Sequence, residues 1–169
     1  EAADGMSNHP RTYAPSLPSP QSLRTGIIPA SAATLIPNGT TIVTLNALGS
    51  RSGLRAAEVV DPTNNVTYYV EYRVATAPDT ANVYGHTLGV RVLRFNPASG
   101  ATVLLDPTPT TTSSRDTDAT LQPGSTFPSY GGHVTITTLS ANNVAQEVAV
   151  TTRRPLVARH STQVDSHLL

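Results

Sequence analysis

The chain has 169 residues, no cysteine and a formal net charge of zero, with a sequence pI of about 7.2. This length suits one domain of ordinary size. The neutral balance argues against a nucleic-acid partner, and the lack of cysteine excludes disulfides, thiolate metal sites and cysteine nucleophiles. No apolar run approaches the roughly 18 residues that a membrane-spanning helix needs, so we expect no membrane span.

The N-terminal part is rich in proline and serine, which oppose both helices and sheet ladders. Residues 19–28 are an exception. Ser19 can cap a helix, Pro20 suits its first turn, and Leu23 and Ile27 lie four residues apart on one helical face. We predict one short helix there, ending before Pro29.

From residue 40 onward, apolar and polar residues alternate with a period of two, which predicts strands. Within residues 66–74, the side chains of Tyr68, Val70 and Tyr72 share one face, and those of Glu71 and Arg73 share the other. The predicted strands cover residues 40–45, 54–60, 66–74, 89–95, 101–105, 133–139 and 144–151.

Three pairs of these strands are joined by short links of turn-forming residues, at 61–65, 96–100 and 140–143. Such links predict hairpins, and three hairpins with a leading strand make about seven strands. Charged residues are only 13% and there is no tryptophan, which suits a thin aliphatic core. We therefore predict an all-β, antiparallel β-sandwich over residues 35–152, followed by a flexible tail over 153–169.

Catalytic motifs are absent from the sequence itself. It contains no His-Glu-x-x-His, no Gly-x-Ser-x-Gly and no phosphate-binding glycine loop, so we expect the chain alone to be non-catalytic. We interpret His86 and His133 as strand-end or surface residues. Asp106, Asp116 and Asp118 share the polar loop 106–119 and could bind calcium, although we favour a solvated loop.

One strand face carries the strongest candidate for a binding site. Tyr69, Glu71 and Arg73 share that face, and Arg91 lies on a neighbouring predicted strand. These residues would form either a surface for a sugar or peptide, or a structural pair in which Glu71 faces Arg91 across the ladder. Because no tryptophan is present to stack on a sugar ring, we favour the structural pair.

Several segments in order resemble the β-sandwich domain that follows the catalytic domain of gametolysin-like and immune-inhibitor-A-like secreted zinc metallopeptidases. In that family a tyrosine-rich strand precedes a Gly-Val-Arg-Val strand, a Leu-Leu-Asp-Pro-Thr-Pro segment and a segment ending in Thr-Phe or Ser-Phe. The matching segments here are Val59-Val60-Asp61-Pro62, Thr67-Tyr68-Tyr69-Val70-Glu71-Tyr72-Arg73, Gly89-Val90-Arg91-Val92-Leu93, Leu104-Leu105-Asp106-Pro107-Thr108-Pro109 and Leu121-Gln122-Pro123-Gly124-Ser125-Thr126-Phe127.

The N-terminal residues extend this resemblance. Asp4-Gly5-Met6-Ser7 resembles the stretch that follows the zinc-binding helix in such enzymes, and residues 17–29 resemble the next helix, although Ile27 replaces the usual aromatic residue. The resemblance implies that Met6 is a structural Met-turn methionine and that residues 1–34 are the end of a catalytic domain. It also implies that the zinc ligands and the general base lie upstream, so this chain would bind no cofactor itself.

The resemblance implies a non-catalytic C-terminal portion of an extracellular bacterial peptidase. Its partners would be the upstream catalytic domain and either protein or cell-wall substrates. The alternatives are a stand-alone extracellular binding or adhesion module and a truncated product without selected activity. Because the chain starts at Glu1 without a signal peptide, we expect a processed or partial product.

Overall fold

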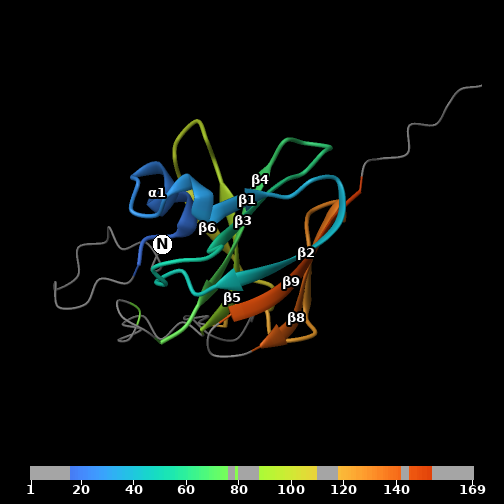
Figure 1. Ribbon diagram of the computed structural model, residues 1–169. Coiled ribbons are helices and arrows are strands. Elements are labelled where there is room, and N and C mark those ends of the chain that lie inside the picture. Colours follow the sequence, from blue (N-terminus) through green and yellow to red (C-terminus); the bar gives the residue numbers. More distant parts are fainter. Residues whose placement is uncertain (1–15, 76–78, 80–87, 110–117, 142–144, 154–169) are drawn as a thin grey trace, which may run out of the picture.

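The strands form two sheets that pack face to face. The computed structural model describes residues 16–75, 79, 88–109, 118–141 and 145–153 (Figure 1). The five-stranded sheet has the order β1 (Ala33–Leu35), β3 (Ala56–Val60), β4 (Thr67–Arg73), β5 (Gly89–Phe95) and β6 (Thr102–Leu105). The four-stranded sheet has the order β2 (Gly39–Asn46), β9 (Ala145–Thr152), β8 (Val134–Ala141) and β7 (Thr126–Pro128). The predicted all-β sandwich is confirmed.

All seven predicted strands are present. The two further strands, β1 and β7, have only three residues each, too few for alternation to be visible. Strand β1 pairs with β3 in parallel, whereas all other pairings between the described strands are antiparallel. The domain boundary expected between residues 34 and 35 falls inside β1.

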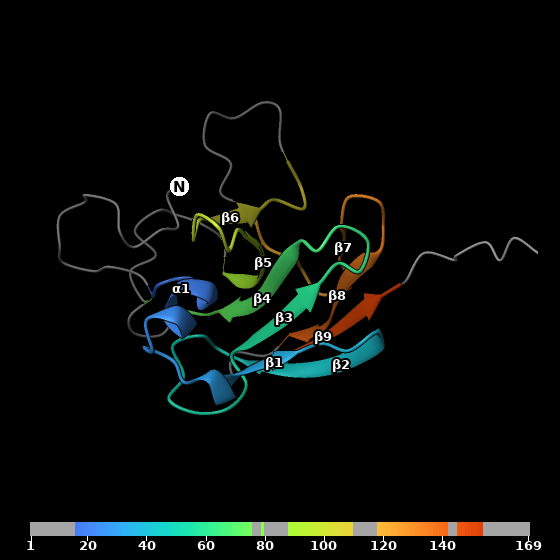
Figure 2. The same ribbon diagram turned by 90° about the horizontal axis from the view of Figure 1, so that it is seen from above.

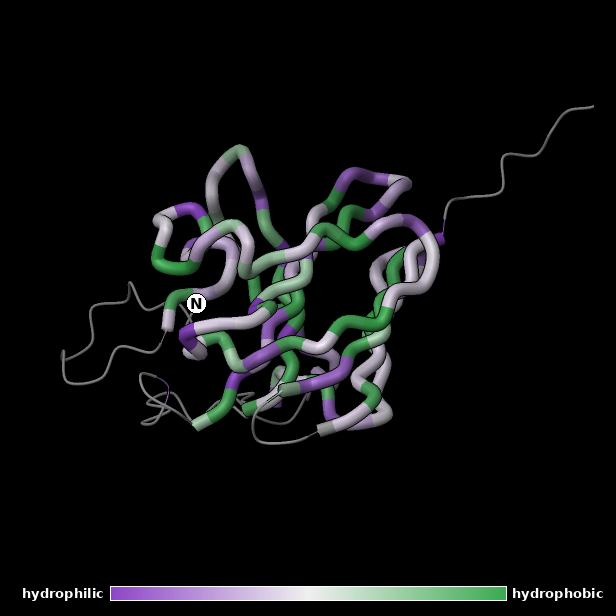
Figure 3. Tube along the Cα trace, viewed as in Figure 1, coloured by the Kyte–Doolittle hydropathy of each residue, from purple (hydrophilic) through white to green (hydrophobic). Residues whose placement is uncertain are grey.

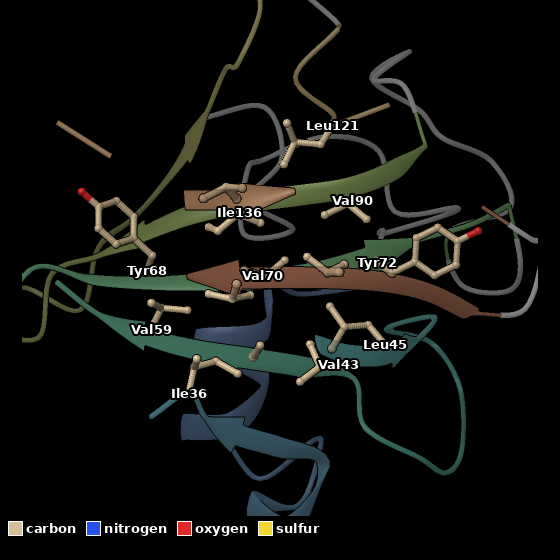
Figure 4. Close-up of a cluster of buried hydrophobic side chains, with 14 of the residues drawn as sticks. Ile36, Val43, Leu45, Val59, Tyr68, Val70, Tyr72, Val90, Leu121 and Ile136 are labelled. Carbon is tan, nitrogen blue, oxygen red and sulfur yellow. The ribbon is translucent and has the colours of Figure 1, made fainter. Parts of the chain in front are cut away.

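Apolar and polar residues alternate along the strands, and the apolar side chains form the core between the two sheets. Tyr68, Val70 and Tyr72 of β4 share one face, as predicted, and this face points into the core with Ile136 of the other sheet (Figure 4). Figure 3 shows the same pattern, with hydrophobic and hydrophilic residues alternating along the strands and a hydrophilic turn between β3 and β4. Strand β4 is buried on both faces, so its outer face must also be covered.

The cover is the segment that precedes the sheets (Figure 2). Helix α1 (Ser19–Arg24) is followed by the 3-10 turn η1 (Ala30–Ala32). The short helix is confirmed, and it ends before Pro29 as predicted. It ends at Arg24, and Gly26 adopts a φ of 72°, which redirects the chain.

Two details of this segment differ from the prediction. Pro18, not Ser19, occupies the N-cap position, and no side-chain hydrogen bond caps the N-terminus of the helix. Ile27 is 64% exposed because the helix has ended before it, whereas Ile28 is buried in a small cluster with Ala32 and Leu48.

A buried aspartate joins the two sheets at one end. Asp61, in the turn after β3, is fully buried. Its Oδ1 accepts hydrogen bonds from the Thr63 N–H (2.9 Å) and hydroxyl, and its Oδ2 accepts one from the Ser129 hydroxyl (3.2 Å) beyond β7. Burial alone would raise the pKa of Asp61, but the hydrogen bonds from Thr63 and Ser129 and the charge of His133 lower it below 3.8.

Replacing this carboxylate should loosen the contact between the sheets. We expect Asp61→Ala to lower the free energy of unfolding by about 2–3 kcal/mol, because buried donors lose a charged acceptor. Urea titration at pH 7 measures the effect. Asp106→Ala is the matched control, since the Asp106 side chain also accepts hydrogen bonds from the Thr108 N–H and hydroxyl, but these bonds lie within its own turn. Equal losses in the two variants would contradict a bridging role.

The same residue predicts a pH dependence. Because the folded-state pKa of Asp61 is lowered, its contribution is fully present above pH 3.8 and is lost as pH falls through the folded-state value. The difference in unfolding free energy between the parent and Asp61→Ala should therefore shrink below pH 4. Urea titrations from pH 2.5 to pH 7 measure it, and a constant difference would contradict the assignment.

Candidate functional site

A cluster of four charged residues lies on the outer face of β4 and β5. The register pairs Glu71 with Arg91, as predicted, and Arg73 follows two residues after Glu71 on the same face. Asp79 joins them from the chain after β4. All four are at most 7% exposed, so this face is not an open binding surface.

Arg73 stands at the centre of the cluster. Its Nε donates to Glu71 Oε1 at 2.8 Å, and its Nη1 donates to Asp79 Oδ1 at 3.1 Å. Two guanidinium groups and two carboxylates give the cluster no net charge. This balance is what permits burial, because an unpaired charge at such a site is strongly unfavourable.

The cluster also binds the backbone of the N-terminal segment. The Ser19 N–H donates to Glu71 Oε2 at 2.7 Å, and Arg73 Nη1 donates to the Ser16 carbonyl at 2.7 Å. The Ser16 N–H donates to Asp79 Oδ1 at 2.8 Å. Glu71 therefore supplies the acceptor that the first turn of α1 lacks, in place of a local cap.

Further contacts hold α1 across the neighbouring strands. The Gln21 side-chain amide donates to the Thr102 hydroxyl of β6, and the Arg24 guanidinium lies over the Phe95 ring of β5, 5.6 Å from its centroid. The helix thus contacts three strands of the larger sheet, and Figure 2 shows it beside β4.

The two arginines differ in electrostatic environment. Burial would lower the pKa of Arg73, but Glu71 and Asp79 outweigh it and raise the pKa. Burial and the nearby Arg73 charge lower the pKa of Arg91, against the opposing effect of the two carboxylates. Arg73 is therefore the cation that the cluster is arranged around.

Tyr69 lies beside the charge cluster on the same strand face but has different neighbours. Its ring is 8% exposed and makes an edge contact with Phe95, with centroids 6.0 Å apart. Burial, followed by the charge of Glu58 and a hydrogen bond to it, raises the pKa of Tyr69 to about 12.

The cluster is suited to holding the segment rather than to catalysis. Both Glu71 oxygens accept charged or backbone N–H donors, so neither is available as a general base. The structure thus brings together Glu71, Arg73 and Arg91 of the predicted residues and adds Asp79, Ser16 and Ser19.

The other predicted site residues lie elsewhere. Met6, His86 and Asp116 fall outside the described residues. His133 is half-buried at the start of β8, near Asp61. Asp106 accepts the Thr108 N–H within its own turn, and the Thr108 hydroxyl donates to the Asp118 carbonyl. No group of three or more metal-ligating side chains occurs in the part of the chain that the structure describes.

Comparison with known proteins does not place the chain in a family: no family model, curated protein or solved structure matches it. Among the described residues, no helix is long and apolar enough to cross a membrane.

Sequence reasoning missed the partners that make this cluster. Asp79 follows a strand without any periodic pattern, and Ser16 and Ser19 contribute backbone atoms that carry no sequence signal. The detectable signal was the placement of Glu71 and Arg73 on one face of a strand.

Removing the Glu71 carboxylate should release α1. We expect Glu71→Ala to lower the free energy of unfolding by about 3–5 kcal/mol, because Arg73 and the Ser19 N–H lose a buried acceptor. Amide exchange at Ser22, which donates to the Pro18 carbonyl in α1, should accelerate more than exchange in β8. Glu147→Ala, on the exposed face of β9, is the control and should change stability by less than about 0.5 kcal/mol. Similar losses in both variants would show that the cluster does not anchor the helix.

Tyr69 should make the fold sensitive to alkali. Its raised pKa means that the neutral phenol stabilises the folded state fully below pH 10, and that this contribution is lost as pH rises toward 12. The parent should lose up to about 2 kcal/mol relative to Tyr69→Phe over this range. Urea unfolding with ultraviolet detection of phenolate measures it. Tyr130→Phe is the control, since that ring is 94% exposed, and an equal effect there would refute the assignment.

Proposed function

We propose that this chain is the non-catalytic β-sandwich portion of a secreted bacterial zinc metallopeptidase, and that the sandwich braces the upstream catalytic domain. In this proposal the upstream part holds zinc and activates water. The sandwich fixes the exit direction of the chain that connects the two.

The observation that carries this proposal is the anchoring of residues 16–19 by the charge cluster. Hydrogen bonds at both Ser16 and Ser19 hold the backbone at two points three residues apart. A flexible tether would need no such contacts. Buried, charged hydrogen bonds to the chain before the sandwich are what a brace between domains requires.

The sequence resemblance provides independent support. The tyrosine-rich segment that resembles the family is β4, whose Glu71 and Arg73 hold the preceding chain. The Gly-Val-Arg-Val segment is β5, which supplies Arg91 to the same cluster. Two of the five matching segments therefore contribute residues to the cluster that holds the N-terminal segment.

The test compares this chain with a longer product that includes the upstream coding sequence. We expect this chain to bind no zinc and to hydrolyse no casein, and the longer product to bind one zinc ion per molecule and to show chelator-sensitive hydrolysis. Zinc is measured by mass spectrometry, and hydrolysis with and without chelator.

Variants of the longer product test the bracing role. Glu71→Gln should shorten the half-life of hydrolytic activity on heating several-fold, because docking weakens, whereas Glu147→Gln should leave it unchanged. Upstream sequence without a His-Glu-x-x-His would refute the proposal and favour a stand-alone binding module. Zinc-dependent hydrolysis by this chain alone would refute it as well.

A further inference from the structure

A cavity of about 550 Å³ opens between the N-terminal segment and the loop that follows β2. Its walls are partly apolar, from Leu17, Ile27, Ile28 and Leu48, and partly cationic, from Arg51 and Arg55. The loop and the segment lie side by side in Figure 2, and the Arg55 N–H donates to the Ala32 carbonyl at 2.7 Å. The volume is that of a small-molecule site.

Arg55 is a buried cation in this wall. It is 7% exposed, and its Nη1 donates to the Ser50 carbonyl at 2.8 Å. Its Nε is buried and has no acceptor within the described part of the chain. Both ion pairs found between described residues belong to Arg73, so no described carboxylate neutralises Arg55.

Comparison with Arg73 shows what is missing. Arg73 is buried to a similar degree and has two carboxylates, Glu71 and Asp79. Burial of a guanidinium without an anion is strongly unfavourable unless a partner arrives from elsewhere. The Arg55 guanidinium lines the cavity without a described carboxylate beside it, and this arrangement indicates an anionic ligand.

The cavity wall selects among anions. Inorganic phosphate and sulfate are hydrated on every side and would gain nothing from Ile27 or Leu17. A carboxylate on a short hydrocarbon stem satisfies both parts of the wall, since the guanidinium pairs with the carboxylate and the stem packs on the apolar residues. Ile27, 64% exposed at the rim, would then be covered.

We propose that this cavity, the Arg55 pocket, binds a carboxylate carried on a short apolar stem. The inference does not depend on the proposed peptidase function. Two sources share this chemistry, namely a free short-chain carboxylic acid and an acidic side chain of polypeptide that lies upstream of this chain.

The test titrates the 169-residue chain with hexanoate while the side-chain Nε–H resonances of arginine are followed by NMR. We expect a saturable shift of the Arg55 resonance at millimolar hexanoate. Hexanamide has the same stem without the charge and should produce less than a tenth of that shift. Inorganic phosphate should be equally weak.

Variants locate the site. Arg55→Gln should abolish the backbone amide shifts that hexanoate causes around Leu48 and Ile28, while Arg94→Gln, an exposed arginine on β5, should retain them. Arg55→Lys keeps the charge without the planar fork and should weaken binding several-fold. The parent titration with hexanoate and hexanamide remains decisive if a variant fails to fold.

The longer product separates the two sources. If the Arg55 resonance of the longer product already lies where hexanoate moves it in the 169-residue chain, and hexanoate does not shift it further, the ligand is an upstream acidic side chain. If hexanoate shifts the resonance of the longer product as it does that of the 169-residue chain, the ligand is a free acid. Absence of saturable binding in the 169-residue chain, equal binding of hexanamide, or binding that persists in Arg55→Gln would overturn the proposal.

Discussion

The structure depends on the burial of β4 on both of its faces. The inner face is apolar and packs between the sheets, but the outer face carries Glu71 and Arg73, which are 1% and 3% exposed. Charges can occupy that position only if each is matched by an opposite charge or by backbone donors and acceptors. The segment around Ser16 and Ser19 provides those groups, so it is part of the folded unit rather than an appendage.

This requirement explains why a six-residue helix is stable on the larger sheet. So short a helix is marginal in water by its own hydrogen bonds. Here Glu71 satisfies the Ser19 N–H, and contacts to Thr102 and Phe95 hold the other turn. In turn, Arg73 Nη1 donates a hydrogen bond to the Ser16 carbonyl. Helix and cluster therefore stabilise each other, and neither would persist in this form alone.

Local pattern was enough to predict the strands but not what covers them. Alternation assigned Glu71 and Arg73 to one face, and the turn-forming link at 61–65 predicted the hairpin of β3 and β4. The cover comes from 52 residues earlier, through the backbone of Ser19, and backbone groups leave no trace in sequence. The prediction that the Ser19 side chain caps the helix was wrong for the same reason, since the distant Glu71 carboxylate accepts the hydrogen bond at this end of the helix. The three-residue strands β1 and β7 are too short to show a period.

The geometry of the anchored segment also bears on how a sandwich could orient another domain. Pro18 and Pro20 each have a restricted φ, and the backbone between Ser16 and Ser19 is held by the cluster, so this stretch has few accessible conformations. A chain that reaches the sandwich through such a stretch arrives from a fixed direction. Rotation about it would break charged hydrogen bonds in a buried site, where they are strongest. In the bracing role that we propose, the orienting element is the contact between the segment and β4, and the sandwich core keeps that strand in place.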